Sequence, residues 1–152
     1  MKKELTNREI ENALNILQGE KSFLRDENFR ISFKNRHAIK VNMKILSERM
    51  GIFAEERADI LRKYEKLGTV KIDEDGRVSL TGQDPAELNK ELNEAYTATN
   101  TLELEKIDIN EFMPLKLTYM EGEVLDLMAE EENDGVVETE PITEPVTGKI
   151  ID

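Results

Sequence analysis

A row of cations carries the clearest chemistry in the sequence. Arg36, Lys40 and Lys44 follow one another at intervals of four residues, so a helix would stack them on one face. Charge-assisted hydrogen bonds from such a row would hold an anion, either a nucleotide or an acidic protein surface. With two neighbours, five residues make up this candidate anion site: Lys34, Arg36, His37, Lys40 and Lys44.

The same row has a second explanation inside the protein. Like charges four residues apart on a helix repel by a few tenths of a kcal/mol per pair, so a counter-charge is expected. Glu103, Glu105 and Asp108 could supply it across the fold. His37 is equally compatible with an ordinary surface position. Both interpretations remain open from the sequence.

An acidic turn invites a calcium interpretation. Asp73, Asp75 and Gly76 match part of a calcium-binding loop, but Lys71 and Gly82 stand where that loop needs acidic ligands. The turn of a β-hairpin explains these residues better. We expect no metal site here.

The sequence lacks the residues that most catalytic mechanisms require. The chain has no Cys and a single His, which argues against disulfides, thiolate metal sites and His-dependent triads. It contains no Gly-rich phosphate loop, nucleophile elbow or metalloprotease helix motif. The many carboxylates suit a solvated acidic surface. We therefore expect a protein that is not an enzyme and that uses no cofactor.

The charge of the chain is unevenly distributed. The net charge is −12 over 152 residues. Residues 1–68 hold 15 basic against 11 acidic residues, residues 69–129 hold 5 against 14, and residues 130–152 hold 1 against 8. An acidic whole argues against direct nucleic-acid binding, which needs clustered positive charge. The absence of a long apolar run or signal peptide predicts a protein without membrane association, and the plain interpretation is a reducing compartment.

The first helix is expected from residue 7 to residue 18. Thr6 and Glu9 fit a capping box, with Leu5 and Ile10 at the positions of a hydrophobic staple. An apolar face follows, and Gly19 is a natural stop. Residues 20–29 resemble a polar connection.

A long helix is expected from about residue 31 to residue 67. Its apolar residues recur in a 4-3 rhythm that Arg57 interrupts, which is typical of a helix packed along another helix. Because the other predicted helices are short, we expect the partner helix to come from a second chain. The predicted oligomer seam is Ile39, Met43, Leu46, Met50, Phe53, Ile60, Tyr64 and Leu67.

The remaining elements are short. We expect a hairpin of strands 70–72 and 78–80, and a helix capped by Asp84 with Pro85 at its first position. Strands are predicted at 102–104 and 107–109, and Thr118 with Glu121 fits a second capping box before a final helix. The fold class is α+β, mostly α: one domain over residues 1–129, with an acidic disordered tail over residues 130–152.

The order of these elements resembles a family of small uncharacterised proteins from tailed phages of Gram-positive bacteria, a domain of unknown function. The shared features are the Leu-Thr-Asn opening at 5–7, the start of the long helix at 33–36, its end at 63–68, the acidic Gly hairpin at 73–76 and the Leu-Thr start of the last helix at 117–118. The resemblance covers residues 5–128. It implies a phage origin, often near tail and lysis genes, and supplies no catalytic residues. A phage origin in turn implies that the protein acts in the host cytoplasm, or alternatively in the virion.

Two functions compete at this stage. The first is a phage-encoded binding protein that counters host antiviral defence, by binding a host defence protein or by sequestering a small anionic nucleotide signal at the basic row. The second is a tail-associated virion or assembly protein, in which the long helix packs against phage tail proteins. The basic row favours the first, and the gene position implied by the resemblance favours the second. In either case we expect a homo-oligomer.

Overall fold

A computed structural model describes residues 1–26 and 30–129. Its elements follow one another in this order: β1 (Lys2–Thr6), α1 (Asn7–Gln18), η1 (Phe23–Arg25), α2 (Phe33–Lys66), β2 (Val70–Ile72), β3 (Val78–Leu80), α3 (Ala86–Thr97), β4 (Thr99–Glu103), η2 (Ile109–Phe112) and α4 (Tyr119–Ala129). The predicted fold class is confirmed: the chain is mostly helical, with one long helix and a small hairpin. The predicted disordered tail, 130–152, lies outside the described residues.

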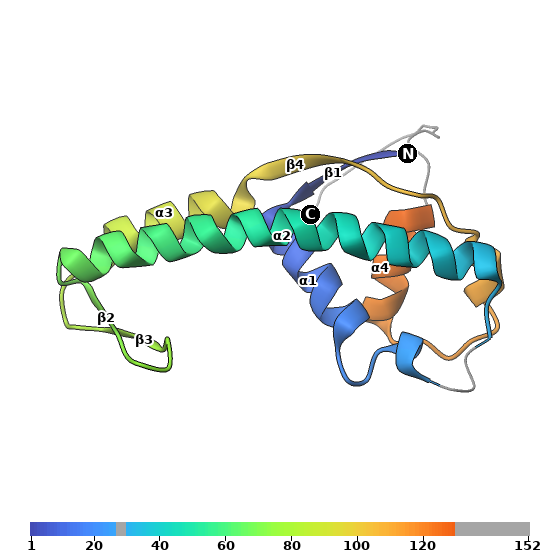
Figure 1. Cartoon of the computed structure of the whole chain (residues 1–152), viewed down its shortest axis with the longest axis horizontal. Coiled ribbons are helices and arrows are strands. Elements are labelled where there is room, and N and C mark those ends of the chain that lie inside the picture. Colours follow the sequence, from blue (N-terminus) through green and yellow to red (C-terminus); the bar gives the residue numbers. More distant parts are fainter. Residues whose placement is uncertain (27–29, 130–152) are drawn as a thin grey trace, which may run out of the picture.

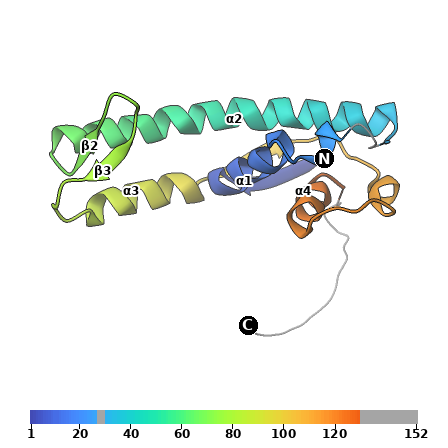
Figure 2. The same cartoon turned by 90° about the horizontal axis from the view of Figure 1, so that it is seen from below.

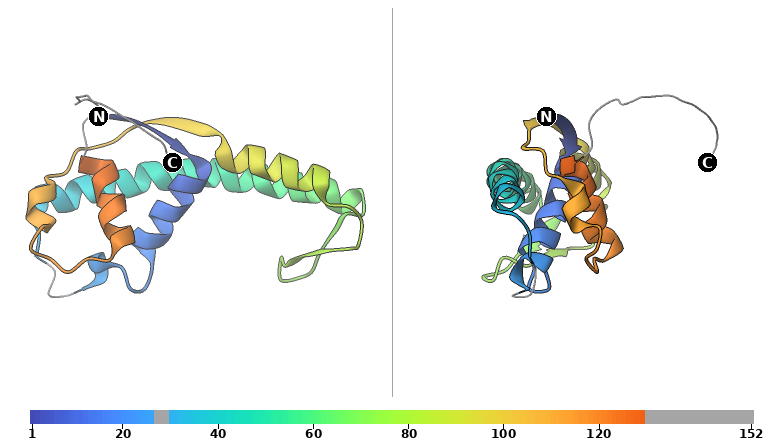
Figure 3. Two further views of the ribbon diagram at one scale, coloured as in Figure 1. Left: turned by 180° about the vertical axis from the view of Figure 1, so that it is seen from behind. Right: turned by 90° about the vertical axis from the view of Figure 1, so that its right-hand side faces the viewer.

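The long helix α2 is the axis of the molecule. In Figure 1 it runs the full length of the view, with the β2–β3 hairpin at one end and α4 near the other. Figure 2 shows α3 and α1 in a row along one side of α2, and both helices contact it. Seen end-on in Figure 3, α2 lies to one side of the other elements. One flank of α2 is therefore open.

The first strand of the chain forms a two-stranded sheet with β4, which ends at Glu103. β1 and β4 pair antiparallel, with Lys2 opposite Glu103 and Thr6 opposite Thr99. The sequence predicted a strand near β4 but did not predict β1. The strand predicted at 107–109 is wrong, because Ile109 already begins the 3₁₀ helix η2. Five mostly polar residues, as in β1, give too short an alternation to mark a strand.

Both predicted capping boxes are confirmed. The Thr6 hydroxyl accepts a hydrogen bond from the Glu9 N–H at 3.1 Å, and the Thr6 N–H donates to the Glu9 carboxylate at 2.8 Å. Thr118 and Glu121 make the same reciprocal pair at 3.1 and 2.9 Å. Each box satisfies backbone donors that the first turn of a helix leaves unpaired, which fixes where α1 and α4 begin.

The start of α3 differs from the prediction by one residue. Pro85 is the cap rather than the first helical residue, and α3 begins at Ala86. Asp84 still serves the helix start, because its carboxylate accepts a hydrogen bond from the Ala86 N–H at 3.0 Å.

The apolar seam of α2 is used within a single chain. Ile39, Leu46, Phe53 and Tyr64 are buried in this one chain, because α1 and α3 together cover the length that a partner helix was expected to cover. The seam splits between two apolar clusters: Ile39 and Leu46 with α1, β4 and α4, and Tyr64 with Val70 and Leu88.

The rest of the seam is less uniform. Met43, Met50 and Ile60 are partly buried against these same clusters. Leu67 is 60% exposed, because α2 ends one residue before it. Burial of the seam therefore needs no second chain, and self-association stays a prediction.

Arg57, which interrupts the seam, joins three helices. Its guanidinium donates to the Tyr96 hydroxyl of α3 at 2.9 Å and lies 3.6 Å from the Glu11 carboxylate of α1. It also lies 5.6 Å from the centre of the Phe53 ring. A long cation is suited to the point where α1 and α3 meet along α2, because its stem packs while its head reaches polar partners on both helices.

Gly68 ends α2 in a left-handed conformation, with φ +84°. The Gly68 N–H donates to the Glu65 carbonyl and the Thr69 N–H to the Tyr64 carbonyl, which together form a Schellman motif. The chain then enters the hairpin, whose turn is held by the Asp73 carboxylate accepting from the N–H groups of Asp75 and Arg77. The predicted hairpin is confirmed, with Val70 opposite Leu80.

We expect Gly68→Ala to lower the free energy of unfolding by about 1–2 kcal/mol, because an L-residue at positive φ is strained. An added Cβ would also lie 3.0 Å from the Gln83 side chain. The matched control is Gly51→Ala inside α2, where nothing lies within 4 Å of the new Cβ. That variant should gain about 1 kcal/mol from helix propensity. Urea denaturation measures the change in the free energy of unfolding for both variants. Changes of the same sign would contradict the requirement for glycine at position 68.

Lys63, Tyr64 and Glu91 form a polar triad between α2 and α3. Lys63 donates to the Glu91 carboxylate at 2.9 Å, and the Tyr64 hydroxyl donates to the same oxygen. This hydrogen bond to Glu91 raises the pKa of Tyr64 to about 12. The hydrogen bond from Lys63, followed by that from Tyr64, lowers the pKa of Glu91.

An absorbance titration should therefore find one tyrosine that ionises near pH 12. Because the folded pKa of Tyr64 lies above its ordinary value of 10.0, the hydroxyl stabilises the fold below pH 10 and loses this contribution as the pH rises through 12. Tyr64→Phe should remove the late transition, and Glu91→Gln should move it toward pH 10. The hydrogen bond to Glu123 also raises the pKa of Tyr119, so only a transition near pH 12 that survives Tyr64→Phe would contradict the assignment.

Candidate functional site

The five residues of the candidate anion site lie on the first three turns of α2. Lys34, His37, Lys40 and Lys44 are exposed, and Arg36 is partly exposed. The buried residues of this stretch occupy the opposite side of the helix: Asn35, Ala38, Ile39, Asn42 and Leu46. Arg36, Lys40 and Lys44 span about 12 Å along the axis at 1.5 Å per residue. We call these five residues the basic face.

No described carboxylate neutralises the basic face. Residues 33–47 contain four Lys and Arg and no Asp or Glu. Within residues 1–26 and 30–129, Lys34, Arg36, Lys40 and Lys44 form no ion pair. The first turn of α2 carries no acidic residue, and Lys34 and Arg36 stand in it, at the end of the helix dipole that favours anions. The Glu111 carboxylate accepts a hydrogen bond from the backbone N–H of Ser32 at the helix cap and forms no ion pair with these four cations.

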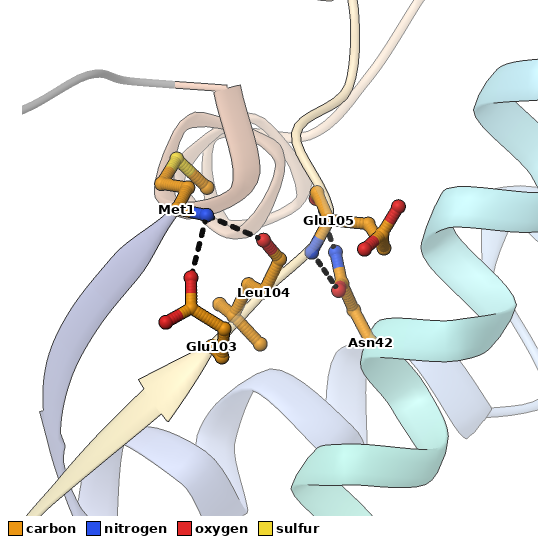
Figure 4. A network of polar contacts seen from close by, with 5 residues as sticks. All are labelled: Met1, Asn42, Glu103, Leu104 and Glu105. Atoms are coloured by element: carbon orange, nitrogen blue, oxygen red, sulfur yellow. Dashed lines mark hydrogen bonds and ion pairs between the residues drawn. The ribbon is translucent and has the colours of Figure 1, made fainter.

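Among the described residues, none of the three carboxylates proposed as internal partners forms an ion pair with the basic face. Glu103 accepts a hydrogen bond from the Met1 ammonium at 2.9 Å (Figure 4), which holds the pKa of that carboxyl below its usual range. Asp108 accepts from the Asn110 N–H and caps η2. Glu105 is exposed and forms no ion pair with the basic face. The internal explanation therefore loses the three residues on which it rested.

Two buried asparagines on the opposite side of α2 hold residues 104–108, which we call the strap. Asn42 donates to the Glu105 carbonyl at 2.8 Å and accepts from the Glu105 N–H at 2.7 Å, as Figure 4 shows. Asn35 does the same with Asp108, at 3.1 and 2.9 Å. Each side-chain amide replaces a neighbouring β-strand by pairing with both backbone groups of one residue.

The spacing of the two asparagines matches the strap. Seven residues of helix rise about 10.5 Å, and three residues of extended chain span about 10 Å, so Asn35 and Asn42 meet Asp108 and Glu105 in antiparallel order. Neither Asn35 nor Asn42 was predicted from the sequence. The available signal was a polar residue recurring at a seven-residue interval beside the apolar seam.

The strap is also tied at its ends. The Leu104 N–H donates to the Met1 carbonyl at 2.8 Å. The Met1 ammonium donates to the Leu104 carbonyl at 3.1 Å (Figure 4). The Ile107 N–H donates to the Met128 carbonyl of α4 at 3.1 Å. The first half of α2 is thereby held in place by its buried side, and the basic face is presented on a rigid helix.

Two features border the basic face. Phe33, which is 79% exposed, stacks on the His37 ring with centroids 5.6 Å apart. Lys34 lines a cavity of about 510 Å³ together with Lys106, Asn110 and Ala129. The face therefore combines cations and an exposed aromatic ring, and its rim reaches the end of α4.

The calcium interpretation gains no support from the hairpin. One Asp73 carboxylate oxygen accepts two backbone N–H groups and is committed to the turn. Among residues 1–26 and 30–129, no three His, Cys, Asp or Glu residues are grouped as metal ligands. In the same part of the chain, no helix is both long and apolar enough to cross a membrane.

Comparison with known proteins gives no assignment. No protein-family signature, no curated protein and no solved structure matches the chain.

Proposed function

We propose that the protein is a non-catalytic binding protein that takes an acidic protein surface on the basic face. The observation that carries this proposal is the absence of an ion-pair partner for four cations within the described residues, on a helix that the strap holds rigid. Rigid presentation lowers the entropy cost of binding, and a row of like charges selects partners of opposite charge.

The shape of the face favours a macromolecule over a small ligand. Small molecules bind mainly in concave sites, whereas Lys40 and Lys44 stand on the convex outer side of a helix. A helical partner or an extended acidic segment can follow a row about 12 Å long. The resemblance to phage proteins makes a host defence protein the proposed partner, and nucleotide capture is the competing outcome of the test.

We expect the double variant Arg36→Glu, Lys40→Glu to weaken binding of the full chain to a fluorescein-labelled poly-L-glutamate by at least about tenfold, or about 1.4 kcal/mol. Fluorescence anisotropy at low salt measures this. The matched control is Lys71→Glu, Arg77→Glu on the hairpin, which changes the net charge equally at two exposed cations. That control should change affinity less than twofold.

The same assay decides between ligand classes. A labelled dinucleotide that binds through Arg36 and Lys40 while poly-L-glutamate does not would replace the protein partner with nucleotide capture. Equal losses in the variant and in its hairpin control would reduce the effect to net charge and overturn the site. Circular dichroism checks that α2 survives both substitutions.

The alternative, a virion or assembly role, is favoured by the far end of the molecule. Leu67, Val78 and Leu80 are all exposed there, and a cavity of about 350 Å³ lies between α2 and the hairpin, lined by Leu61 and Ile72. Exposed apolar groups of this kind suit protein contacts. Mass spectrometry of purified phage particles tests this alternative, and absence of the protein from the particles would remove it.

A further inference from the structure

The segment that follows α4 has the charge that the basic face lacks. Residues 130–152 contain eight acidic residues and one Lys, a net charge of −7. Three of the acidic residues, Glu130, Glu131 and Glu132, come directly after the last described residue, Ala129. The basic face carries four cations for which the described residues supply no ion pair.

The segment also starts beside that face. Ala129 lines the same cavity as Lys34, at the rim of the basic face. The 23 residues that follow could extend up to about 75 Å, whereas residues 33–47 occupy about 22 Å of helix. Both the starting point and the length therefore allow the segment to reach every cation of the face.

We propose that residues 130–152 bind the basic face of their own chain and compete there with the external acidic partner. This inference rests on the proposed function, since it assigns the same face a second, tethered occupant. A tethered segment acts at an effective concentration of the order of 1 mM. Even a weak contact would then occupy the face until a partner with higher affinity displaces it.

Zero-length carbodiimide cross-linking of the full chain tests the contact directly, because it joins amines and carboxylates that form ion pairs. We expect cross-links from Lys34, Lys40 and Lys44 to the acidic residues of 130–152, in preference to Lys71 and Lys90, which are also exposed. Lys63 and Glu91, 2.9 Å apart, provide a positive control in the same sample. Mixing ¹⁴N and ¹⁵N protein separates contacts within a chain from contacts between chains.

The cross-linking result decides whether the tail contacts the basic face. Cross-links within one chain that are lost in high salt support the proposal. Cross-links between chains, or none to α2 while the Lys63–Glu91 product forms, overturn it.

A second measurement separates this proposal from the proposed function. Replacing seven tail carboxylates by amides should tighten poly-L-glutamate binding by about tenfold, given an effective concentration near 1 mM and a tail contact of about 0.1 mM. The positions are Glu130, Glu131, Glu132, Asp134, Glu138, Glu140 and Glu144. If parent and amide variant bind poly-L-glutamate equally tightly and no cross-links from the tail to α2 form, the tail contact alone is refuted. If the parent protein forms the cross-links but neither it nor the amide variant binds poly-L-glutamate, the proposed function alone is refuted.

Discussion

We expect Asn42→Ala to lower the free energy of unfolding by about 3–5 kcal/mol. Asn42 is fully buried, and its amide is the hydrogen-bond partner of both backbone groups of Glu105. Truncation leaves that N–H and that carbonyl without a partner, at about 1–3 kcal/mol each, and adds a small cavity. For a chain of this size the melting temperature should fall by roughly 10 °C or more.

Two further variants sharpen the test. Asn15→Ala, at an exposed position of α1, should change stability by less than about 0.5 kcal/mol. Asn42→Asp keeps the oxygen that accepts from the Glu105 N–H but places a second oxygen against the Glu105 carbonyl. Burial would raise the pKa of the new carboxyl, so Asn42→Asp should regain stability as the pH falls. A melting temperature of Asn42→Ala within 2 °C of the parent would refute the stabilising role of the Asn42–Glu105 hydrogen bonds.

The second large effect is expected at Phe53. Its ring is 1% exposed and lies 4.9 Å from the Tyr96 ring, at the point where α1 and α3 meet along α2. Phe53→Ala should cost about 3–5 kcal/mol through lost burial and the cavity that remains. Ile52→Ala, one residue earlier and 55% exposed, is the matched control and should cost far less.

The same experiment tests whether the seam acts inside one chain. If Phe53 packs only against its own chain, the urea midpoints of parent and variant should be unchanged over a hundredfold range of protein concentration. A stability that depends on a second chain would rise by about 2.7 kcal/mol over that range. A concentration-dependent midpoint that disappears in Phe53→Ala would restore the oligomer seam.

Local signals in the sequence were sufficient for most element boundaries. Thr6 with Glu9, and Thr118 with Glu121, marked two helix starts because a capping box is complete within four residues. Gly68 marked the end of α2 because its required conformation disfavours other residues. The charge spacing likewise placed Arg36, Lys40 and Lys44 along one side of a helix, and the structure leaves Lys40 and Lys44 exposed.

Long-range pairings could not be obtained in this way. β1 is defined by a partner about a hundred residues away, and no pattern within Lys2–Thr6 indicates it. The role of Asn42 depends on which backbone faces it, which the sequence does not state. For the same reason the candidate carboxylates Glu103 and Asp108 could be named but not placed, and their actual partners are Met1 and Asn110.

The pairing of β1 with β4 has a consequence for how the chain folds. During synthesis β1, α1 and α2 are all made before β4, yet the sheet cannot close until Glu103 is available to lie opposite Lys2. The α2–α3 end with its hairpin needs only nearby contacts, such as Lys63 with Glu91. Local contacts form quickly and closure over long loops is slow, so this end should become structured first. The side of α1 that α4 covers stays exposed until residues 119–129 are made, which leaves it open to aggregation or chaperone binding before release.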